Sequence, residues 1–197
     1  MRTFIAIDVN HEIREASQEV IGKLQEAGFK AAWTKPENVH LTLFFMGEMD
    51  DKAIDSMVYS LNKRMQGFPS FSTRLTGLEY FKFKHSPRVL FLKFEPTKSL
   101  QKMYLEMKSE LTKNKIKYDD QGNFVPHVTL GRVKEYPTEW ERITSEIAIP
   151  NIILVIDGFT VYNSTLTPQG PTYNWIYKSK FEGGLEKNAR RNEKRCT

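Results

Sequence analysis

The sequence repeats one short pattern, and this repeat limits the fold more than any other feature of the chain. Residues 39–47 read VHLTLFFMG and residues 126–133 read PHVTLGRV, so each contains a histidine, an aliphatic residue, a threonine and a leucine in the same order. The two histidines, His40 and His127, are 87 positions apart. The repeat indicates a duplicated unit, or at least two strands that face each other about a pseudo-twofold axis.

Both copies of the pattern have the alternation of a β-strand. Successive side chains of a strand point to opposite faces, so His40 shares one face with Thr42, and His127 shares one with Thr129. Two such strands side by side place two imidazoles and two hydroxyls around a common groove. One imidazole can take a proton from an attacking water, and the other can give a proton to a leaving oxygen. The hydroxyls, with the guanidinium of Arg132, can hold the oxygens of a phosphodiester.

A structural or metal-binding role fits the two histidines less well. A single His-x-Thr pattern is not specific, because a histidine on a strand is more often a hydrogen-bonded structural residue. A zinc site lacks a cysteine or carboxylate at ligand spacing from either histidine. The sequence has no G-x-S-x-G elbow, P-loop or dinucleotide-binding glycine motif. The pattern therefore predicts metal-independent chemistry with no cofactor.

The hydrophobic pattern predicts an α+β protein with more strand than a simple βαβ repeat. Helical spacing of apolar residues predicts helices, and apolar runs bounded by turn residues predict strands. The predicted helices span residues 11–27, 51–65, 97–113 and 137–147. The predicted strands span residues 3–9, 39–46, 71–83, 88–94, 126–133, 152–165 and 173–181.

Most of the net charge is at the C-terminal end. The 197 residues carry a net charge of +5, and residues 183–197 hold five basic and two acidic side chains, or +3. Residues 1–182 therefore carry only +2 and have no obvious internal boundary. We expect a single domain over residues 1–182 and a basic, flexible tail over residues 183–197.

Three features bear on the compartment. No run reaches the roughly 18 apolar residues that a membrane helix needs. The apolar stretch at the N-terminus ends at Asp8 without a small-residue cleavage site. The single cysteine, Cys196, cannot form an internal disulfide, which favours a reducing compartment. We expect a cytoplasmic protein with no membrane partner.

Beyond these arguments, the chain resembles the 2H phosphoesterases, specifically the RNA 2′,3′-cyclic phosphodiesterases, which are also called 2′-5′ RNA ligases or LigT-like proteins. The resemblance runs through MRTFIAID, ENVHLTLFFMGE, NFVPHVTLGR and STLTPQGPTY. It implies a bilobal fold of two antiparallel-sheet lobes related by a pseudo-twofold axis, with outer helices and a central cleft. It also implies hydrolysis of a terminal 2′,3′-cyclic phosphate of RNA to a 2′-phosphate.

The same resemblance implies a role for each residue of the repeated pattern. His40 corresponds to the proton donor for the leaving 3′ oxygen, and His127 corresponds to the proton acceptor from water. Thr42 and Thr129 correspond to the hydroxyls that bind the phosphate.

Two positions depart from the simple pattern. Arg132 matches a phosphate-binding arginine of the family, but strict alternation points it away from His127 unless a bulge at Gly131 turns it back. Phe44 stands where many members of the family carry a basic residue, and alternation places it on the groove face with His40. We expect Phe44 either to contact a base by stacking or to pack in the core or rim.

The expected partner is an RNA with a 2′,3′-cyclic phosphate end or a small cyclic nucleotide, bound by a monomer. Two alternatives stay open. The chain can be a nucleotide- or RNA-binding module that uses the same cleft without turnover, or an enzyme of 2′-5′ RNA ligation. The presence of both histidines, both threonines and Arg132 favours an enzyme.

Overall fold

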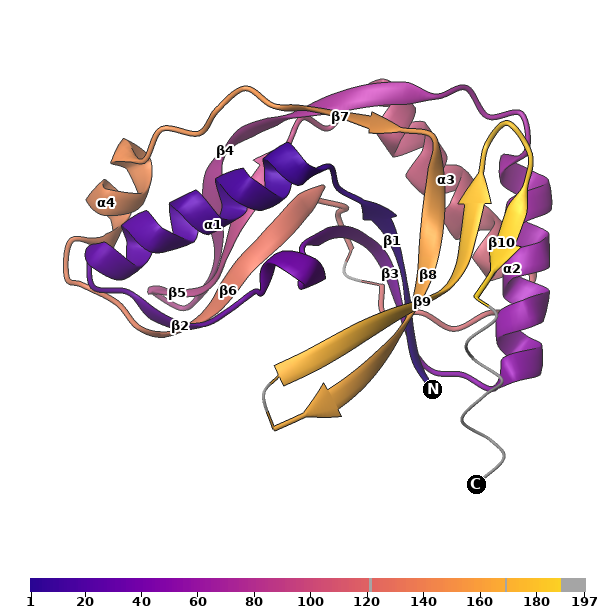
Figure 1. Cartoon of the computed structure of the whole chain (residues 1–197), viewed down its shortest axis with the longest axis horizontal. Coiled ribbons are helices and arrows are strands. Elements are labelled where there is room, and N and C mark those ends of the chain that lie inside the picture. The colour runs from indigo at the N-terminus through magenta and orange to yellow at the C-terminus, as the bar shows by residue number, and fades with distance from the viewer. Residues whose placement is uncertain (121, 169, 189–197) are drawn as a thin grey trace.

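The computed structural model describes residues 1–120, 122–168 and 170–188 (Figure 1). The α-helices are α1 (His11–Glu26), α2 (Asp51–Met65), α3 (Lys98–Lys113) and α4 (Trp140–Glu146), and a short 3₁₀ helix, η1, spans Pro36–Asn38. The strands are β1 (Arg2–Asp8), β2 (Lys30–Trp33), β3 (His40–Glu48), β4 (Phe71–Phe83), β5 (Ser86–Phe94), β6 (His127–Glu135), β7 (Ile153–Ile156), β8 (Gly158–Thr167), β9 (Gly170–Lys180) and β10 (Leu185–Lys187). The predicted α+β class is confirmed.

The strands form an antiparallel sheet in two parts that meet at the two histidine strands. The strand order is β10-β9-β8-β1-β3-β6-β5-β4-β7, and β2 pairs with β6 outside this order. β3 pairs with β6 at a single residue pair, Leu41 with Val128, and residues 131–135 of β6 then pair with β2. We call β10-β9-β8-β1-β3 the His40 lobe, and β6-β5-β4-β7 with β2 the His127 lobe.

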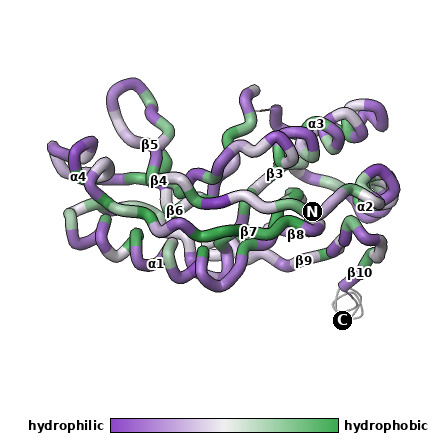
Figure 2. Tube along the Cα trace, turned by 90° about the horizontal axis from the view of Figure 1, so that it is seen from above, coloured by the Kyte–Doolittle hydropathy of each residue, from purple (hydrophilic) through white to green (hydrophobic). Residues whose placement is uncertain are grey.

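The helices are amphipathic and lie at opposite ends of the molecule. Figures 1 and 2 place α1 and α4 at the end that holds β4, β5 and β6, and α2 and α3 at the other end near β10. In α1, the side chain of Asn10 caps the first turn by accepting from the Ile13 amide, and the buried face includes Val20 and Leu24. The colour of the helices accordingly alternates along the tube in Figure 2, as expected for helices with one apolar face.

Long-range strand pairing changes several of the predicted elements. The expected strand 152–165 is two strands that separate at Asp157, because β7 pairs with β4 while β8 pairs with β1 and β9. The helix expected over 137–147 is shorter, and β2 was not predicted. No helix in the described part of the chain is both long and apolar enough to cross a membrane.

The segment expected as a basic tail starts with a short strand. Within residues 183–197, Leu185–Lys187 forms β10 and pairs with β9. Residues 189–197, which include Cys196, lie outside the described residues, so the flexible tail stays a prediction there.

Candidate active site

The two histidine strands have the same layout. β3 and β6 are each nine residues long and show the same sequence of half-buried, buried and exposed side chains. In both strands the fourth and fifth residues are buried in succession, which breaks the alternation of a regular strand.

In β3, the break is a β-bulge at Leu43. β1 pairs Ile5 with Phe44 and then Ala6 with Thr42, so Leu43 has no partner of its own. The extra residue reverses the alternation at Phe44 and Phe45, before a second shift of the register between Phe45 and Gly47.

In β6, the same bulge occurs at Leu130. β5 pairs Leu90 with Gly131 and then Phe91 with Thr129. The bulges in the two strands are therefore at equivalent positions, three residues after each histidine, which supports the pseudo-twofold relation that the repeated pattern predicts.

The bulge in β6 returns Arg132 to the groove face. Arg132 follows the reversal and is exposed, on the side of His127. Burial raises the pKa of Tyr173, and the positive charge of Arg132 acts in the opposite direction, so Arg132 lies near Tyr173. The ring of Tyr173 in turn contacts His40 edge-on, with 5.2 Å between the ring centroids. A Cβ at Gly131 would lie 2.7 Å from the Trp33 ring, so glycine here lets β2 pack closely against β6.

The bulge in β3 removes Phe44 from the groove, so the placement expected from simple alternation is wrong. Phe44 is buried in the core, where its ring stacks on Tyr104 of α3 at 4.7 Å between centroids. Phe45 takes the groove side instead and is 47% exposed. Of the two uses considered for Phe44, core packing is the one that the structure supports.

Register brings the four residues of the repeated pattern together. Leu41 of β3 pairs with Val128 of β6, so His40, Thr42, His127 and Thr129 each lie one residue from the point where the two strands meet. The two imidazoles are close enough for the charge of His127 to lower the pKa of His40.

Both imidazoles are held in one orientation by the same backbone contact. His40 Nδ1 lies 2.7 Å from the carbonyl oxygen of Asn38, and His127 Nδ1 lies 2.7 Å from that of Val125. Because a carbonyl can only accept, each Nδ1 carries a proton and donates it. Each neutral ring therefore has an unprotonated Nε2 that is free to accept a proton from a substrate or water.

His40 lies among aromatic rings. It stacks on Phe4 at 4.8 Å between centroids, and Tyr162 lies 6.1 Å away. Burial among these rings is the largest influence and lowers the pKa of His40 to about 4, although the Asn38 carbonyl and the carboxylate of Asp8 act in the opposite direction.

His127 has a smaller aromatic surround. The rings of Phe91 and Phe81 lie 4.8 and 5.3 Å from its centroid. Burial lowers the pKa of His127, and the Val125 carbonyl partly offsets this effect. In the free protein at neutral pH, both imidazoles are therefore mostly uncharged.

Asn38 is a site residue that the sequence reasoning missed. Its carbonyl orients His40, and its buried side chain donates to the carbonyl of Pro171 at 2.8 Å. This contact ties η1, which precedes β3, to the hairpin of β8 and β9 that carries Tyr173. Asn38 and Tyr173 lie inside the stretches ENVHLTLFFMGE and STLTPQGPTY on which the family resemblance rests, and that was the available signal.

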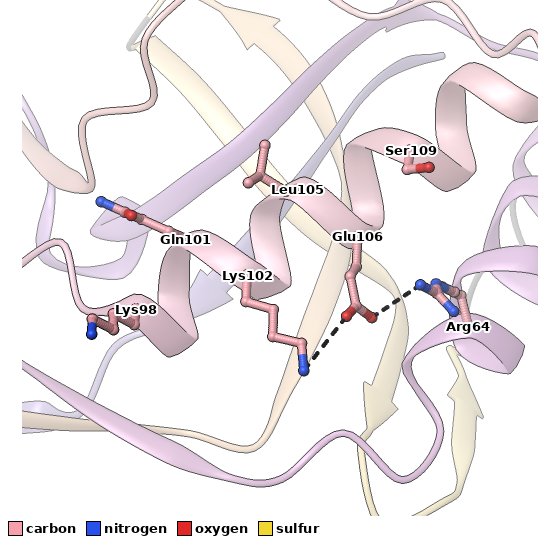
Figure 3. A pocket seen from close by; sticks show the side chains of 7 residues that line it. All are labelled: Arg64, Lys98, Gln101, Lys102, Leu105, Glu106 and Ser109. Carbon is pink, nitrogen blue, oxygen red and sulfur yellow. Dashed lines mark ion pairs between the residues drawn. The ribbon is translucent and has the colours of Figure 1, made fainter.

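One surface hollow lies away from the two histidines. It measures about 500 Å³ and lies along α3, with Arg64 of α2 at its edge (Figure 3). Its one carboxylate, Glu106, is 3.4 Å from Arg64 and 3.9 Å from Lys102. No histidine lines it, so it offers no equivalent of the paired imidazoles.

Among the described residues, no group of three or more histidine, cysteine or acidic side chains is placed to hold a metal ion.

Comparisons with curated proteins identify relatives along nearly the whole chain. It is 49% identical over 185 residues to an RNA 2′,3′-cyclic phosphodiesterase of Thermotoga maritima, covering 94% of this chain and 98% of the relative. It is 30% identical to an RNA 2′,3′-cyclic phosphodiesterase of Archaeoglobus fulgidus, covering 88% and 96% of the two chains.

Solved structures agree with this fold. TT0787 of Thermus thermophilus matches with a TM-score of 0.75 and 26% identity, covering 93% of this chain and 99% of that one. Escherichia coli LigT in complex with 3′-AMP matches with a TM-score of 0.66 and 24% identity, covering 91% and 96%. The expected bilobal fold of the 2H phosphoesterases is thus confirmed.

The family assignment follows from the paired histidine strands and these relatives together. The model of the 2′-5′ RNA ligase superfamily matches residues 13–166, which include both bulged strands. The chain belongs to the 2′-5′ RNA ligase superfamily of 2H phosphoesterases.

Proposed function

We propose that this protein hydrolyses a terminal 2′,3′-cyclic phosphate of RNA to a 2′-phosphate, with His40 and His127 as its catalytic acid and base. The observation that carries the proposal is the equivalence of the two bulged strands, each of which presents one oriented imidazole and one hydroxyl. Two relatives named RNA 2′,3′-cyclic phosphodiesterase, at 49% and 30% identity, support the same reaction.

The reaction requires one proton transfer at each side of the phosphorus. His127 Nε2 accepts a proton from water as the water oxygen forms a bond to phosphorus. The bond from phosphorus to the 3′ oxygen breaks, and His40 Nε2 gives its proton to that oxygen. The product keeps the phosphate on the 2′ oxygen, and a proton exchange with solvent restores the two histidines.

The phosphate oxygens need neutralisation and alignment. The hydroxyls of Thr42 and Thr129 can donate to the non-bridging oxygens from the two strands, and the guanidinium of Arg132 can bind them through two parallel hydrogen bonds. Both contributions are greater in the transition state, because donors fixed in advance stabilise the negative charge that develops on these oxygens there.

The low pKa of His40 must rise before His40 can act as an acid. In the free protein, burial holds this pKa at about 4. A bound cyclic phosphate places a negative charge beside the ring, and an opposite charge within about 4–6 Å favours the protonated form. Substrate binding and protonation of His40 are therefore coupled, and each favours the other.

Product analysis of a defined RNA tests the proposal. The purified protein is incubated with an oligonucleotide that ends in a 2′,3′-cyclic phosphate, and the products are separated by chromatography against authentic standards that end in a 2′-phosphate or a 3′-phosphate. We expect a 2′-phosphate and a free 3′ hydroxyl. A 3′-phosphate, or no conversion by a folded protein, would contradict the proposal.

The same experiment separates the alternatives. Binding without conversion identifies a binding module. A second RNA with a 5′ hydroxyl, added to the reaction, reveals ligation as a longer product with a 2′-5′ linkage. The variant with both His40→Ala and His127→Ala is the control for a contaminating nuclease.

Three narrower points stay predictions from the sequence. They are the monomeric state, the cytoplasmic location and the domain boundary after residue 182. Size-exclusion chromatography with light scattering tests the first of them directly.

A further inference from the structure

Asp8 is the cross-strand neighbour of His40. The register of β1 and β3 pairs the two residues directly, so their side chains lie on the same face of the sheet. Three groups from the neighbouring strands fix the carboxylate. Thr160 Oγ1 donates to Oδ2 at 3.1 Å, the hydroxyl of Tyr162 donates to Oδ1, and Lys178 Nζ lies 3.1 Å from Oδ2.

This carboxylate is ionised as well as fixed. Burial raises the pKa of Asp8, but the hydrogen bonds from Tyr162, Lys178 and Thr160, together with the charge of Lys178, outweigh burial and lower the pKa overall. A permanent negative charge therefore lies next to His40, on the side away from His127.

The groups around His40 come from five elements and differ in sign. Asp8 favours the charged imidazolium, whereas His127 and Arg14 disfavour it. The phenols that face the ring are neutral at physiological pH, because burial is the largest influence and raises the pKa of each. These titratable and charged neighbours are Asp8 of β1, Arg14 of α1, His127 of β6, Tyr162 of β8 and Tyr173 of β9. Asp8 is thus the one side chain in this set that stabilises positive charge on His40.

The equivalent neighbour in the other lobe has the opposite charge. The register of β5 and β6 pairs His127 with Lys93, whose ammonium lies 2.7 Å from Glu79. Among the described residues, no carboxylate contributes to the pKa of His127, which depends on burial and on the Val125 carbonyl. The two histidines are therefore equivalent in backbone geometry and different in the charge beside them.

We propose that Asp8 is a positioning residue for His40: its anchored carboxylate stabilises the imidazolium from which His40 protonates the leaving oxygen. Asp8 thereby distinguishes the proton donor from the proton acceptor in an otherwise symmetric pair. This inference rests on the proposed function for its catalytic consequence, but the coupling between Asp8 and His40 can be measured without any substrate.

The kinetic test compares two substrates in Asp8→Asn. The cyclic phosphate has a poor leaving group that needs a proton, whereas a nitrophenyl phosphodiester has a good one that does not. We expect Asp8→Asn to lower kcat at pH 7.5 about tenfold on the cyclic phosphate, which corresponds to one unit in the pKa of His40. The rate on the nitrophenyl ester should change less than twofold. Asp8→Glu, which keeps the charge, should recover part of the loss.

The matched control is Asp157→Asn. Asp157 also forms an ion pair with a lysine of β9, Lys180, at 2.5 Å, but it does not contribute to the pKa of His40. Its substitution should leave both rates unchanged. If Asp8→Asn does not fold, Tyr162→Phe removes one anchor of the carboxylate and should produce a smaller loss with the same substrate dependence.

An NMR titration of the His40 ring in the free protein provides the second readout. The pKa should be lower in Asp8→Asn than in the unsubstituted protein, and unchanged in Asp157→Asn. Equal losses on both substrates with an unaltered titration would mean that Asp8 is only structural, and would overturn the inference. If the unsubstituted protein does not open the cyclic phosphate, the proposed function fails, while the titration still decides whether Asp8 is coupled to His40.

Discussion

Leu43 and Leu130 are equivalent bulge residues, each three positions after a histidine and each without a partner in the neighbouring strand. Because of these bulges, the residue five positions after each histidine returns to the groove face. In one strand that residue is Arg132, and in the other it is Phe45. The groove therefore has a cation on the His127 side and an exposed aromatic ring at the equivalent place on the His40 side.

Two adjacent phenylalanines give the first prediction. Phe44→Ala should lower the free energy of unfolding by about 3–5 kcal/mol, because a buried ring is removed from its contact with Tyr104. Phe45→Ala should change stability by less than about 0.5 kcal/mol, because this side chain is largely at the surface. It should instead raise KM for a nucleotide substrate. Urea unfolding and steady-state kinetics measure both effects, and the reverse pattern would mean that β3 has no bulge in solution.

These bulges mark the limit of what the sequence could predict. Regular alternation was sufficient to place His40, Thr42, His127 and Thr129 on a common face, since all four lie before the bulges. After the bulges, the alternation in the sequence no longer predicts which face a side chain occupies. The position of each bulge depends on how β1 pairs with β3 and how β5 pairs with β6. The glycine at position 131 was a signal for one bulge, but Phe44 gave no such signal for the other.

The same reasoning explains which elements were predicted. α2 and β4 have the bounds expected from the sequence, because a long apolar periodicity defines each of them. β2 was missed because it is four residues long and is defined by its pairing with β6. Asn38 was missed for a similar reason, since its contact with Pro171 joins residues 133 positions apart.

Arg132→Lys provides the second prediction. Lysine keeps the charge but loses the planar pair of donors, so alignment of the phosphate should deteriorate and kcat/KM for a cyclic nucleotide should fall by about tenfold to a hundredfold. The control is Arg142→Lys on α4, where the guanidinium binds the exposed carboxylates of Glu139 and Glu146. Unchanged kinetics in both variants would mean that Arg132 does not contact the phosphate.

Metal dependence gives the third prediction. Two histidines can supply both proton transfers, so activity on the cyclic phosphate should persist in excess EDTA. The rate is measured before and after dialysis against the chelator, with the folded state checked by circular dichroism. Loss of activity that a divalent cation restores would show that the two imidazoles are not sufficient.

Acid sensitivity gives the fourth prediction. The ordinary pKa of histidine is 6.5, and the folded protein holds His40 at about 4. Between these values the unfolded chain binds a proton that the folded protein excludes, so stability is complete above about pH 6.5 and falls as the pH approaches 4. The loss from His40 alone should be about 3 kcal/mol.

The variant His40→Gln isolates this contribution, because glutamine cannot ionise. Its free energy of unfolding should fall less steeply between pH 6.5 and 4 than that of the unsubstituted protein. Other titrating groups are present in both proteins and cancel in the difference. Parallel curves would show that His40 titrates normally in the folded state.

The division of work between the histidines gives the last prediction. Replacing either one with alanine should remove one proton transfer and lower the rate on a cyclic phosphate by about 10² to 10⁴. The double variant should lose much less activity than the product of the two single losses, because the acid and the base act in the same step.

The two roles should separate with the leaving group of the substrate. Expulsion of the ribose oxygen needs the proton from His40, but expulsion of nitrophenolate does not. On a nitrophenyl phosphodiester, His40→Ala should therefore recover most of its activity, whereas His127→Ala should not, since water still needs a base. The decisive quantity is the ratio of the two variants' rates on each substrate. Recovery of His127→Ala instead would reverse the assignment of acid and base. It would also contradict the role proposed for Asp8, because the carboxylate would then stabilise positive charge on the proton acceptor.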